Sequence, residues 1–279
     1  MRYRSIFRPD LFQGQVHLVT GGGTGIGRAI ALELGSLGAT VVLAARRPEP
    51  LEQVAEEVRS LGGRAEACPT NVREAEEVEA LLAFVAERCG RLDGLVNNAG
   101  GQFLSPAQEI SPNGWRSVVD LNLTGTFLVS RAAFKAFFAD AGGAVVNVVS
   151  EMWRGFPGMA HSGAARAGVV NLTRTLAVEW AERGVRVNAV APGVIASSGL
   201  ETYPESARSF LDEIAADVPA KRFGSVSEVA AGVVYLLSPA ASYVSGETLR
   251  IDGAASLWRK TWPIDAHDRW PTFDALSED

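Results

Sequence analysis

The chain has 279 residues, of which 47% are hydrophobic, and its formal net charge at pH 7 is −6. This length is typical of one large α/β domain with a well-buried core, and an acidic chain without a basic stripe is not expected to bind nucleic acid. No apolar run reaches the roughly 18 residues of a membrane span, and Cys68 and Cys89 match no metal or redox spacing, so we expect a cytoplasmic protein that uses no membrane and no metal.

The first apolar run of the chain leads into a glycine-rich turn. Residues 16–19 are predicted as a buried strand, and a helix with apolar residues at helical spacing begins at Arg28. Between them lie Thr20-Gly21-Gly22-Gly23-Thr24-Gly25-Ile26-Gly27. Glycines let the backbone approach a pyrophosphate, and free N–H groups at a helix start point toward its negative charge. In this setting the turn predicts a dinucleotide cofactor and an oxidoreductase, whereas alone it would serve as a tight strand-to-helix connection.

Strand-like and helix-like segments alternate along the rest of the chain. Further strands are predicted at 40–44, 64–67, 94–97, 144–149, 185–190 and 247–251, and further helices at 50–61, 73–89, 114–139, 163–183 and 225–237. This alternation predicts an α/β fold with a single Rossmann-type, doubly wound parallel sheet and helices on both faces. We expect residues 1–279 to form one domain whose core spans about residues 14–253.

Two segments interrupt the alternation. Residues 196–218 are polar and irregular and follow a strand end, where ligands bind in open α/β sheets, so they form either a substrate lid or a surface insertion. The C-terminal tail, residues 254–279, contains Trp258, Trp262 and Trp270. This aromatic density predicts that the tail packs on a surface, either of its own chain or of a neighbouring subunit.

The end of the second strand bears on the choice between NAD and NADP. An acidic residue at this point would bind the adenosine ribose and repel an additional phosphate. This chain has Ala44 and Ala45 there, followed by Arg46 and Arg47. Because guanidinium groups match phosphate geometry, we expect NADP, with Arg46 on its 2′-phosphate, while Arg47 is equally well explained as a solvated charge at a helix start.

These motifs resemble those of the short-chain dehydrogenase/reductase family. The glycine-rich turn fits T-G-x-x-x-G-x-G, and the family's other marks are Asn97-Asn98-Ala99-Gly100, Asn122 within a Leu-Asn-Leu-Thr-Gly run, and Pro192-Gly193. The resemblance covers about residues 14–253 and implies three groups of cofactor-binding residues. They are Thr20, Gly21, Thr24, Gly25, Ile26, Gly27 and Arg46 around the phosphates; Asn71, Val72, Asn98, Ala99 and Gly100 on the adenosine side; and Arg166, Pro192, Gly193 and Ile195 near the nicotinamide and its ribose.

The catalytic helix departs from the pattern of this family. Members usually carry Tyr-x-x-x-Lys there, in which the tyrosine donates a proton to a carbonyl oxygen and the lysine holds the nicotinamide ribose. Ser162 and Arg166 stand at these two positions, and no tyrosine of this chain takes the missing place. A serine hydroxyl is a weaker acid than a phenol, and an arginine does not deprotonate. Ordinary ketone reduction is therefore not favoured by this pair.

Two segments resemble the enoyl-thioester reductases of the family. Residues 97–106 and 161–169 are similar to peroxisomal trans-2-enoyl-CoA reductase and, more distantly, to the 2,4-dienoyl-CoA reductases. Reduction of a conjugated thioester develops an enolate, which needs hydrogen-bond donors but no strong acid. We expect Ser162 to donate to the thioester oxygen, Arg166 to hold the ribose and Asn122 to hold a water. Ser150 ends the fifth strand and is a further catalytic candidate, although a strand-end hydroxyl explains it equally well.

Three functions are left open by the sequence. The leading expectation is an NADPH-dependent reductase that acts on the carbon–carbon double bond of a trans-2-enoyl or 2,4-dienoyl thioester in fatty-acid metabolism. The alternatives are an NADPH-dependent 3-oxoacyl or carbonyl reductase and a catalytically silent nucleotide-binding protein. The helices at 114–139 and 163–183 are apolar on more than one face, and together with the family resemblance this implies a homotetramer.

Overall fold

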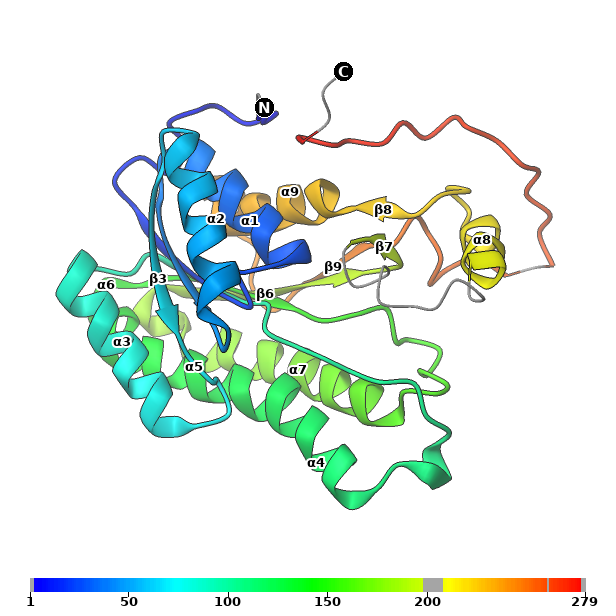
Figure 1. Cartoon of the computed structure of the whole chain (residues 1–279), viewed down its shortest axis with the longest axis horizontal. Helices are drawn as coiled ribbons and strands as arrows, with labels where there is room; N and C mark the ends of the chain where they lie inside the picture. The colour runs from blue at the N-terminus through cyan, green and yellow to red at the C-terminus, as the bar shows by residue number, and fades with distance from the viewer. Residues whose placement is uncertain (1–2, 198–207, 260, 277–279) are drawn as a thin grey trace.

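The computed structural model describes residues 3–197, 208–259 and 261–276. Seven parallel strands form one sheet in the order β3-β2-β1-β4-β5-β6-β9 (Figure 1). They are β1 (Val16–Thr20), β2 (Thr40–Ala45), β3 (Arg64–Pro69), β4 (Gly94–Asn97), β5 (Gly143–Val148), β6 (Val185–Pro192) and β9 (Thr248–Ile251). The order reverses next to β1, and this arrangement confirms the predicted doubly wound, Rossmann-type fold.

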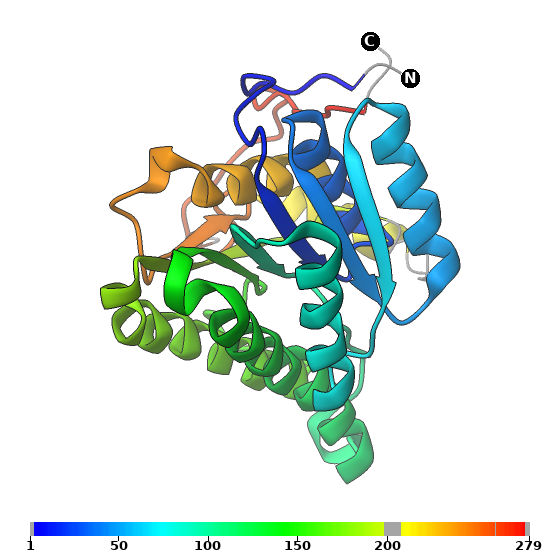
Figure 2. The same cartoon turned by 90° about the vertical axis from the view of Figure 1, so that its left-hand side faces the viewer.

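Helices cover both faces of the sheet (Figure 2). One layer consists of α1 (Gly25–Ser36), α2 (Pro48–Ser60) and α9 (Val226–Leu237), and the other contains α3 (Ala75–Cys89), α4 (Pro112–Val119), α5 (Gly125–Ala133), α6 (Ala139–Ala141) and α7 (Ala160–Glu179). Within the described residues, no helix combines the length and the apolar character that crossing a membrane requires.

The central strands are buried on both faces, which explains why they read as continuous apolar runs rather than as alternating patterns. Val19 and Leu43 pack against the layer of α1, α2 and α9. Leu18 and Val42, their neighbours along the same strands, pack against the opposite layer. Apolar cores on both faces therefore fix the sheet between the helices, and the parallel strands have their carboxyl ends at one edge.

The helix predicted at 114–139 is not a regular α-helix. Two π-helical turns, Asp120–Thr124 and Phe134–Phe138, interrupt it between α4, α5 and α6. The first turn contains Asn122, whose side chain is fully buried. A π-turn inserts one residue into the helical spacing, and such turns are frequent at functional sites. The hydrophobic periodicity of the sequence does not reveal this inserted residue.

The segment predicted as a substrate lid is described only in part. Residues 198–207 lie outside the described residues, whereas α8 (Arg208–Asp217) follows them, and the short strands β7 (Ile195–Ala196) and β8 (Gly224–Ser225) pair in parallel. This small pair was not predicted, because two-residue strands have too little length to show a periodicity. It brings the chain that leaves β6 beside the N-terminus of α9.

Candidate active site

The glycine-rich turn packs tightly against the end of β4. A Cβ atom on Gly27 would lie 2.2 Å from the carbonyl oxygen of Gly21 and 2.6 Å from Nδ2 of Asn98, so only glycine fits there. The Asn98 amide donates to the carbonyl oxygens of Thr20 (3.0 Å) and Gly21 (3.1 Å). The hydroxyl of Thr20 accepts from the N–H groups of Asn98 and Ala99. These contacts bring the residues predicted to bind the phosphates next to those predicted to bind the adenosine.

The N-terminus of α1 leaves donors for an anion. Thr24 is the N-cap residue, and its side chain makes no capping hydrogen bond. The N–H groups of Gly25, Ile26 and Gly27 lie too early in α1 to bond a carbonyl oxygen of the helix, and the N-cap side chain does not accept from them. A helix N-terminus with free N–H groups favours a phosphate, so the turn fits the pyrophosphate of a dinucleotide.

A cavity of about 210 Å³ extends from this turn to the ends of β2 and β3. Its walls include the predicted cofactor residues Gly21, Thr24, Arg46, Asn71, Val72, Ala99 and Gly100. Arg46 and Arg47 both line it and are exposed, and neither forms an ion pair with a carboxylate of the described residues. The cavity therefore offers two free guanidinium groups beside the adenosine side of the site.

The predicted catalytic residues Asn122 and Ser162 lie together at the carboxyl edge of the sheet. The Asn122 side chain accepts from the N–H of Gly101 (2.9 Å) and donates to its carbonyl oxygen (3.1 Å). It also donates to Oγ of Ser162 at 3.5 Å. Asn122 is thus held by backbone on one side and points its amide toward the Ser162 hydroxyl on the other.

Gln102 is a site residue to which the sequence analysis assigned no role. The Ser162 hydroxyl donates to Oε1 of Gln102 at 2.7 Å, which completes a chain of hydrogen bonds from Asn122 through Ser162 to this amide. Sixty positions separate the two partners in the sequence. The only sequence signal was the position of Gln102 two residues after Gly100, within the segment 97–106 that resembles the enoyl-thioester reductases.

Arg166 lies beneath the ends of β4 and β5. One guanidinium N–H donates to the carbonyl oxygen of Val148 at 2.6 Å, and a Cβ atom on Gly100 would lie 2.1 Å from Nη2. The residue is 8% exposed, and burial lowers the pKa of Arg166 to about 10. No carboxylate of the described residues pairs with it. The site therefore contains a buried positive charge that lacks a negative partner.

The segment that follows β5 carries several buried polar atoms without a hydrogen-bond partner in the described structure. They are Oγ of Ser150, Oε1 of Glu151, Nε1 of Trp153 and Nε2 of His161. Buried polar atoms are normally paired, so these atoms, on residues 150–153 and at the start of α7, are available to a polar ligand. The predicted catalytic candidate Ser150 is one of these residues, but it makes no hydrogen bond to Ser162.

His161 is fully buried beside Ser162. Its Nδ1 accepts from the N–H of Ser162 at 2.7 Å, and its ring meets that of Phe103 edge to face. Burial lowers the pKa of His161, so the neutral ring is favoured at neutral pH. Nε2 of this ring has no hydrogen-bond partner among the described residues.

The residues predicted on the nicotinamide side lie at the neighbouring strand end. The N–H of Glu151 donates to the carbonyl oxygen of Pro192 at 3.0 Å, which joins the ends of β5 and β6. A Cβ atom on Gly193 would lie 2.9 Å from Cα of Asp252, so a side chain does not fit. Ile195 is buried and begins β7. Ser162 and Arg166 therefore lie at the same edge of the sheet as the residues predicted to border the nicotinamide.

Comparison with known proteins agrees with this geometry. The family model described as Enoyl-(Acyl carrier protein) reductase matches residues 21–255. The peroxisomal 2,4-dienoyl-CoA reductase of Danio rerio is 40% identical over 96% of this chain and 88% of its own. A 3-oxoacyl-[acyl-carrier-protein] reductase of Synechocystis is 39% identical over 86% of this chain and 96% of its own.

A solved structure extends the likeness. The citronellol catabolism dehydrogenase AtuB of Pseudomonas aeruginosa superposes with a TM-score of 0.82 at 52% sequence identity, covering 91% of this chain and 100% of that protein. The matched lengths, the strand order and the cofactor motif all agree. This chain therefore belongs to the short-chain dehydrogenase/reductase family of oxidoreductases, whose members bind a nicotinamide cofactor.

Proposed function

We propose that this protein is an NADPH-dependent reductase of the carbon–carbon double bond of a trans-2-enoyl or 2,4-dienoyl thioester. The observation that carries the proposal is the buried, unpaired charge of Arg166, one helical turn after Ser162 on α7, at the positions where the family usually has lysine and tyrosine. A positive field and neutral donors stabilise an enolate oxygen, whereas they supply no strong acid to a ketone.

The residues of the cofactor region fit NADPH. The turn that contains Gly21 and Gly27 and the N-terminus of α1 would hold the pyrophosphate, and Arg46 and Arg47 would hold the 2′-phosphate. When bound, NADPH supplies a hydride. Pro192 and the residues after it would border the nicotinamide at the end of β6.

The residues of this chain would act on the oxygen of the thioester. Addition of hydride to the far end of the conjugated system would develop negative charge on that oxygen. Ser162 exchanges its bond to Gln102 for one to the developing enolate, and Asn122 supports the hydroxyl by donating to it. Arg166 adds a positive field within a buried setting, where charge acts strongly. The enolate then takes a proton at carbon from water.

A reductase of 3-oxoacyl thioesters is the second candidate, because one relative of 39% identity carries that name. The name of AtuB, a citronellol catabolism dehydrogenase, adds citronellol to the compounds to be tested. Both reactions transfer a proton at a carbonyl or hydroxyl oxygen, and the described site offers a serine in place of a phenol for that transfer.

The deciding experiment follows NADPH oxidation with crotonyl-, decenoyl-, decadienoyl- and acetoacetyl-CoA, and NADP reduction with citronellol, each offered separately. We expect turnover with the unsaturated thioesters only. Turnover of acetoacetyl-CoA or citronellol alone would replace the proposal with carbonyl chemistry, and NADPH binding without any turnover would indicate a silent protein. In parallel, Tyr203→Phe should retain activity, because the proposed chemistry needs no tyrosine from the segment expected to form a lid.

We further propose that the protein is a homotetramer. Trp115 on α4, Phe127 on α5 and Val178 on α7 are exposed apolar side chains on one helical layer. Helices that are apolar outside the core-facing stripe need a second partner. Light scattering at micromolar concentration should give four times the subunit mass, and a monomer mass would contradict this assembly.

A further inference from the structure

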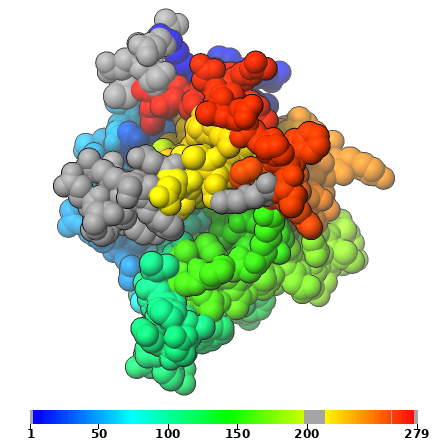
Figure 3. All heavy atoms as spheres, turned by 90° about the vertical axis from the view of Figure 1, so that its right-hand side faces the viewer, coloured from blue at the N-terminus to red at the C-terminus, as the bar shows by residue number. Residues whose placement is uncertain are grey.

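The C-terminal tail returns across the segment that carries α8. After β9 it passes the stem of that segment, residues 218–225, continues over the N-terminus of α9 and reaches the N-terminal residues, where Arg4 donates its N–H to the carbonyl oxygen of Ala275 (Figure 1). Figure 3 shows the tail in orange and red beside α8 in yellow. The tail therefore packs on its own chain, and its path lies at the catalytic edge of the sheet.

Lys221 and Trp258 form the first junction between the stem and the tail. The N–H of Ala220 donates to the carbonyl oxygen of Gly253 at 3.3 Å. Nζ of Lys221 donates to the carbonyl oxygen of Ala216 in the last turn of α8 (2.7 Å), and it lies 5.0 Å from the ring centroid of Trp258. One ammonium group thus contacts both α8 and the tail.

The backbone at this junction is strained. Among the described residues, Lys221 (φ 58°) and Ala254 (φ 69°) are the two non-glycine residues with positive φ. Lys221 follows Ala220, and Ala254 follows Gly253. Ala220 and Gly253 form the hydrogen bond that joins the stem to the start of the tail. Left-handed backbone in a residue with a Cβ persists where the surrounding structure imposes it, and it often marks a functional constraint.

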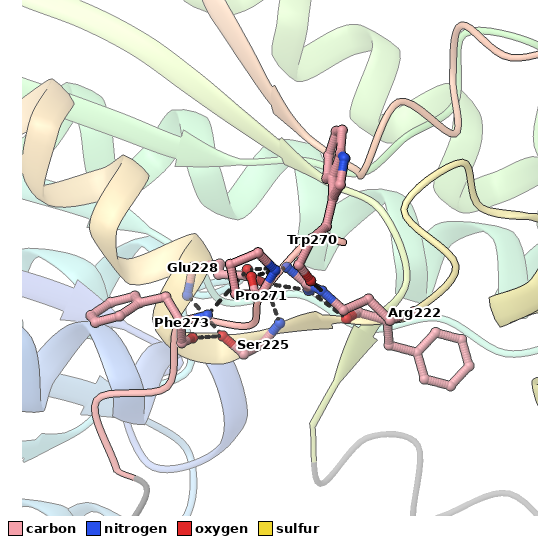
Figure 4. A network of polar contacts seen from close by, with 7 residues as sticks. Arg222, Ser225, Glu228, Trp270, Pro271 and Phe273 are labelled. Atoms are coloured by element: carbon pink, nitrogen blue, oxygen red, sulfur yellow. Dashed lines mark hydrogen bonds and ion pairs between the residues drawn. The ribbon is translucent and has the colours of Figure 1, made fainter. Parts of the chain in front are cut away.

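Arg222 forms the second junction (Figure 4). Its guanidinium donates to the carbonyl oxygens of Trp270 and Pro271, both at 2.9 Å. The same group binds both carboxylate oxygens of Glu228 at 2.6 and 3.0 Å. Glu228 in turn accepts from the N–H groups of Ser225 and Phe273, and these interactions lower the pKa of its carboxyl. Arg222 therefore joins the stem, the first turn of α9 and the tail.

We propose that the C-terminal tail positions α8 over the acyl site, with Arg222 as the positioning residue. The inference rests on the proposed function for its substrate, because α8 is taken to cover the bound thioester. The residues of the 210 Å³ cofactor cavity include no part of the stem or the tail. The affinity for NADPH should therefore stay unchanged when the Arg222 junction is lost. The same loss should release α8 and raise the KM for the thioester.

The test compares Arg222→Gln with Arg186→Gln. Arg186 is a matched control, because its guanidinium also donates to backbone carbonyl oxygens, those of Leu236, Leu237 and Ser238 at the other end of α9. Both variants should lower the melting temperature. Only Arg222→Gln should raise amide hydrogen exchange in α8, by about tenfold, and the KM for the thioester, by about fivefold or more. Arg222→Lys, which retains the charge opposite Glu228, should recover part of both effects.

Deletion of residues 264–279 gives an independent variant, since it removes the carbonyl partners of Arg222 in the tail, Trp270 and Pro271, and leaves Arg222 itself in place. It should reproduce the rise in α8 exchange. Unchanged exchange in α8 for both Arg222→Gln and the deletion, or equal changes in Arg186→Gln, would overturn the inference. The exchange measurement uses no substrate, so it decides this point even if no thioester proves to be turned over.

Discussion

The cofactor turn and the catalytic helix of this protein relate to their family in opposite ways. In the turn, Gly21, Gly27 and Asn98 match the family pattern, and the backbone contacts that require them are present. On α7, Ser162 and Arg166 occupy the two family positions at the same edge of the sheet but differ in chemistry. The fold therefore preserves where a side chain is placed, whereas the chemistry placed there is free to change.

The contacts of the two regions explain this difference. A side chain on Gly27 would collide with a backbone carbonyl oxygen, which has no room to move. The Ser162 hydroxyl instead donates to the side chain of Gln102, and a side chain can adapt to a different partner by rotation. Backbone contacts thus restrict the turn to one residue type, while side-chain contacts allow α7 to accept others.

The largest expected effect comes from breaking the turn. Gly27→Ala places a Cβ atom 2.2 Å from the carbonyl oxygen of Gly21 and should weaken NADPH binding by about 100-fold or more. Gly101→Ala is the control, since its Cβ would meet only the side chain of Leu121, at 3.3 Å, and the affinity should be retained. Calorimetric titration with NADPH measures both, and wild-type affinity in Gly27→Ala would contradict this view of the turn.

The next effect concerns the sheet beneath both regions. His17 is fully buried in β1, and burial lowers its pKa from 6.5 to about 4. The unfolded chain binds a proton at this residue below pH 6.5, so stability is lost as the pH falls from 6.5 toward 4, by about 3 kcal/mol in all. Chemical denaturation across this pH range should show a smaller decrease in the free energy of unfolding for His17→Gln than for the unmodified protein. Parallel curves for the two proteins would contradict the prediction.

A smaller effect is expected on the catalytic helix. Ser162→Ala removes one donor to the enolate oxygen and should lower kcat for an enoyl thioester by about tenfold or more. Arg166→Lys should reduce kcat more than NADPH affinity, because lysine retains the charge but not the planar fork. Ser130→Ala, which changes a buried serine bonded to Asn97 outside the site, serves as a control for packing. An unchanged kcat in Ser162→Ala would mean that this serine only fills space.

The smallest effect sharpens the assignment of the cofactor. Arg46→Ala should remove most of the preference for NADPH over NADH, by about tenfold or somewhat more for one charge-assisted bond. Arg47 lines the same cavity. Comparing Arg47→Ala with Arg46→Ala therefore shows which guanidinium binds the 2′-phosphate. Equal affinities for NADPH and NADH in the unmodified protein would rule out both assignments.

The sequence by itself determined the fold class and the place of the cofactor turn. Both follow from local features, because apolar periodicity, β-rich runs and glycines at a turn act within a few residues of one another. It also located Asn122, Ser162 and Arg166 through motifs of fixed spacing. Their catalytic roles, the tetramer and the choice of NADPH stay predictions.

Only the tertiary structure decided which groups meet. Gln102 lies 60 positions from Ser162, and the tail joins Arg222 from 48 positions away, so neither contact has a local signal. The π-turn that contains Asn122 and the unpaired charge of Arg166 likewise depend on packing between elements. Periodicity records whether a residue is buried, but its hydrogen-bond partner depends on the order and register of the strands that carry both residues.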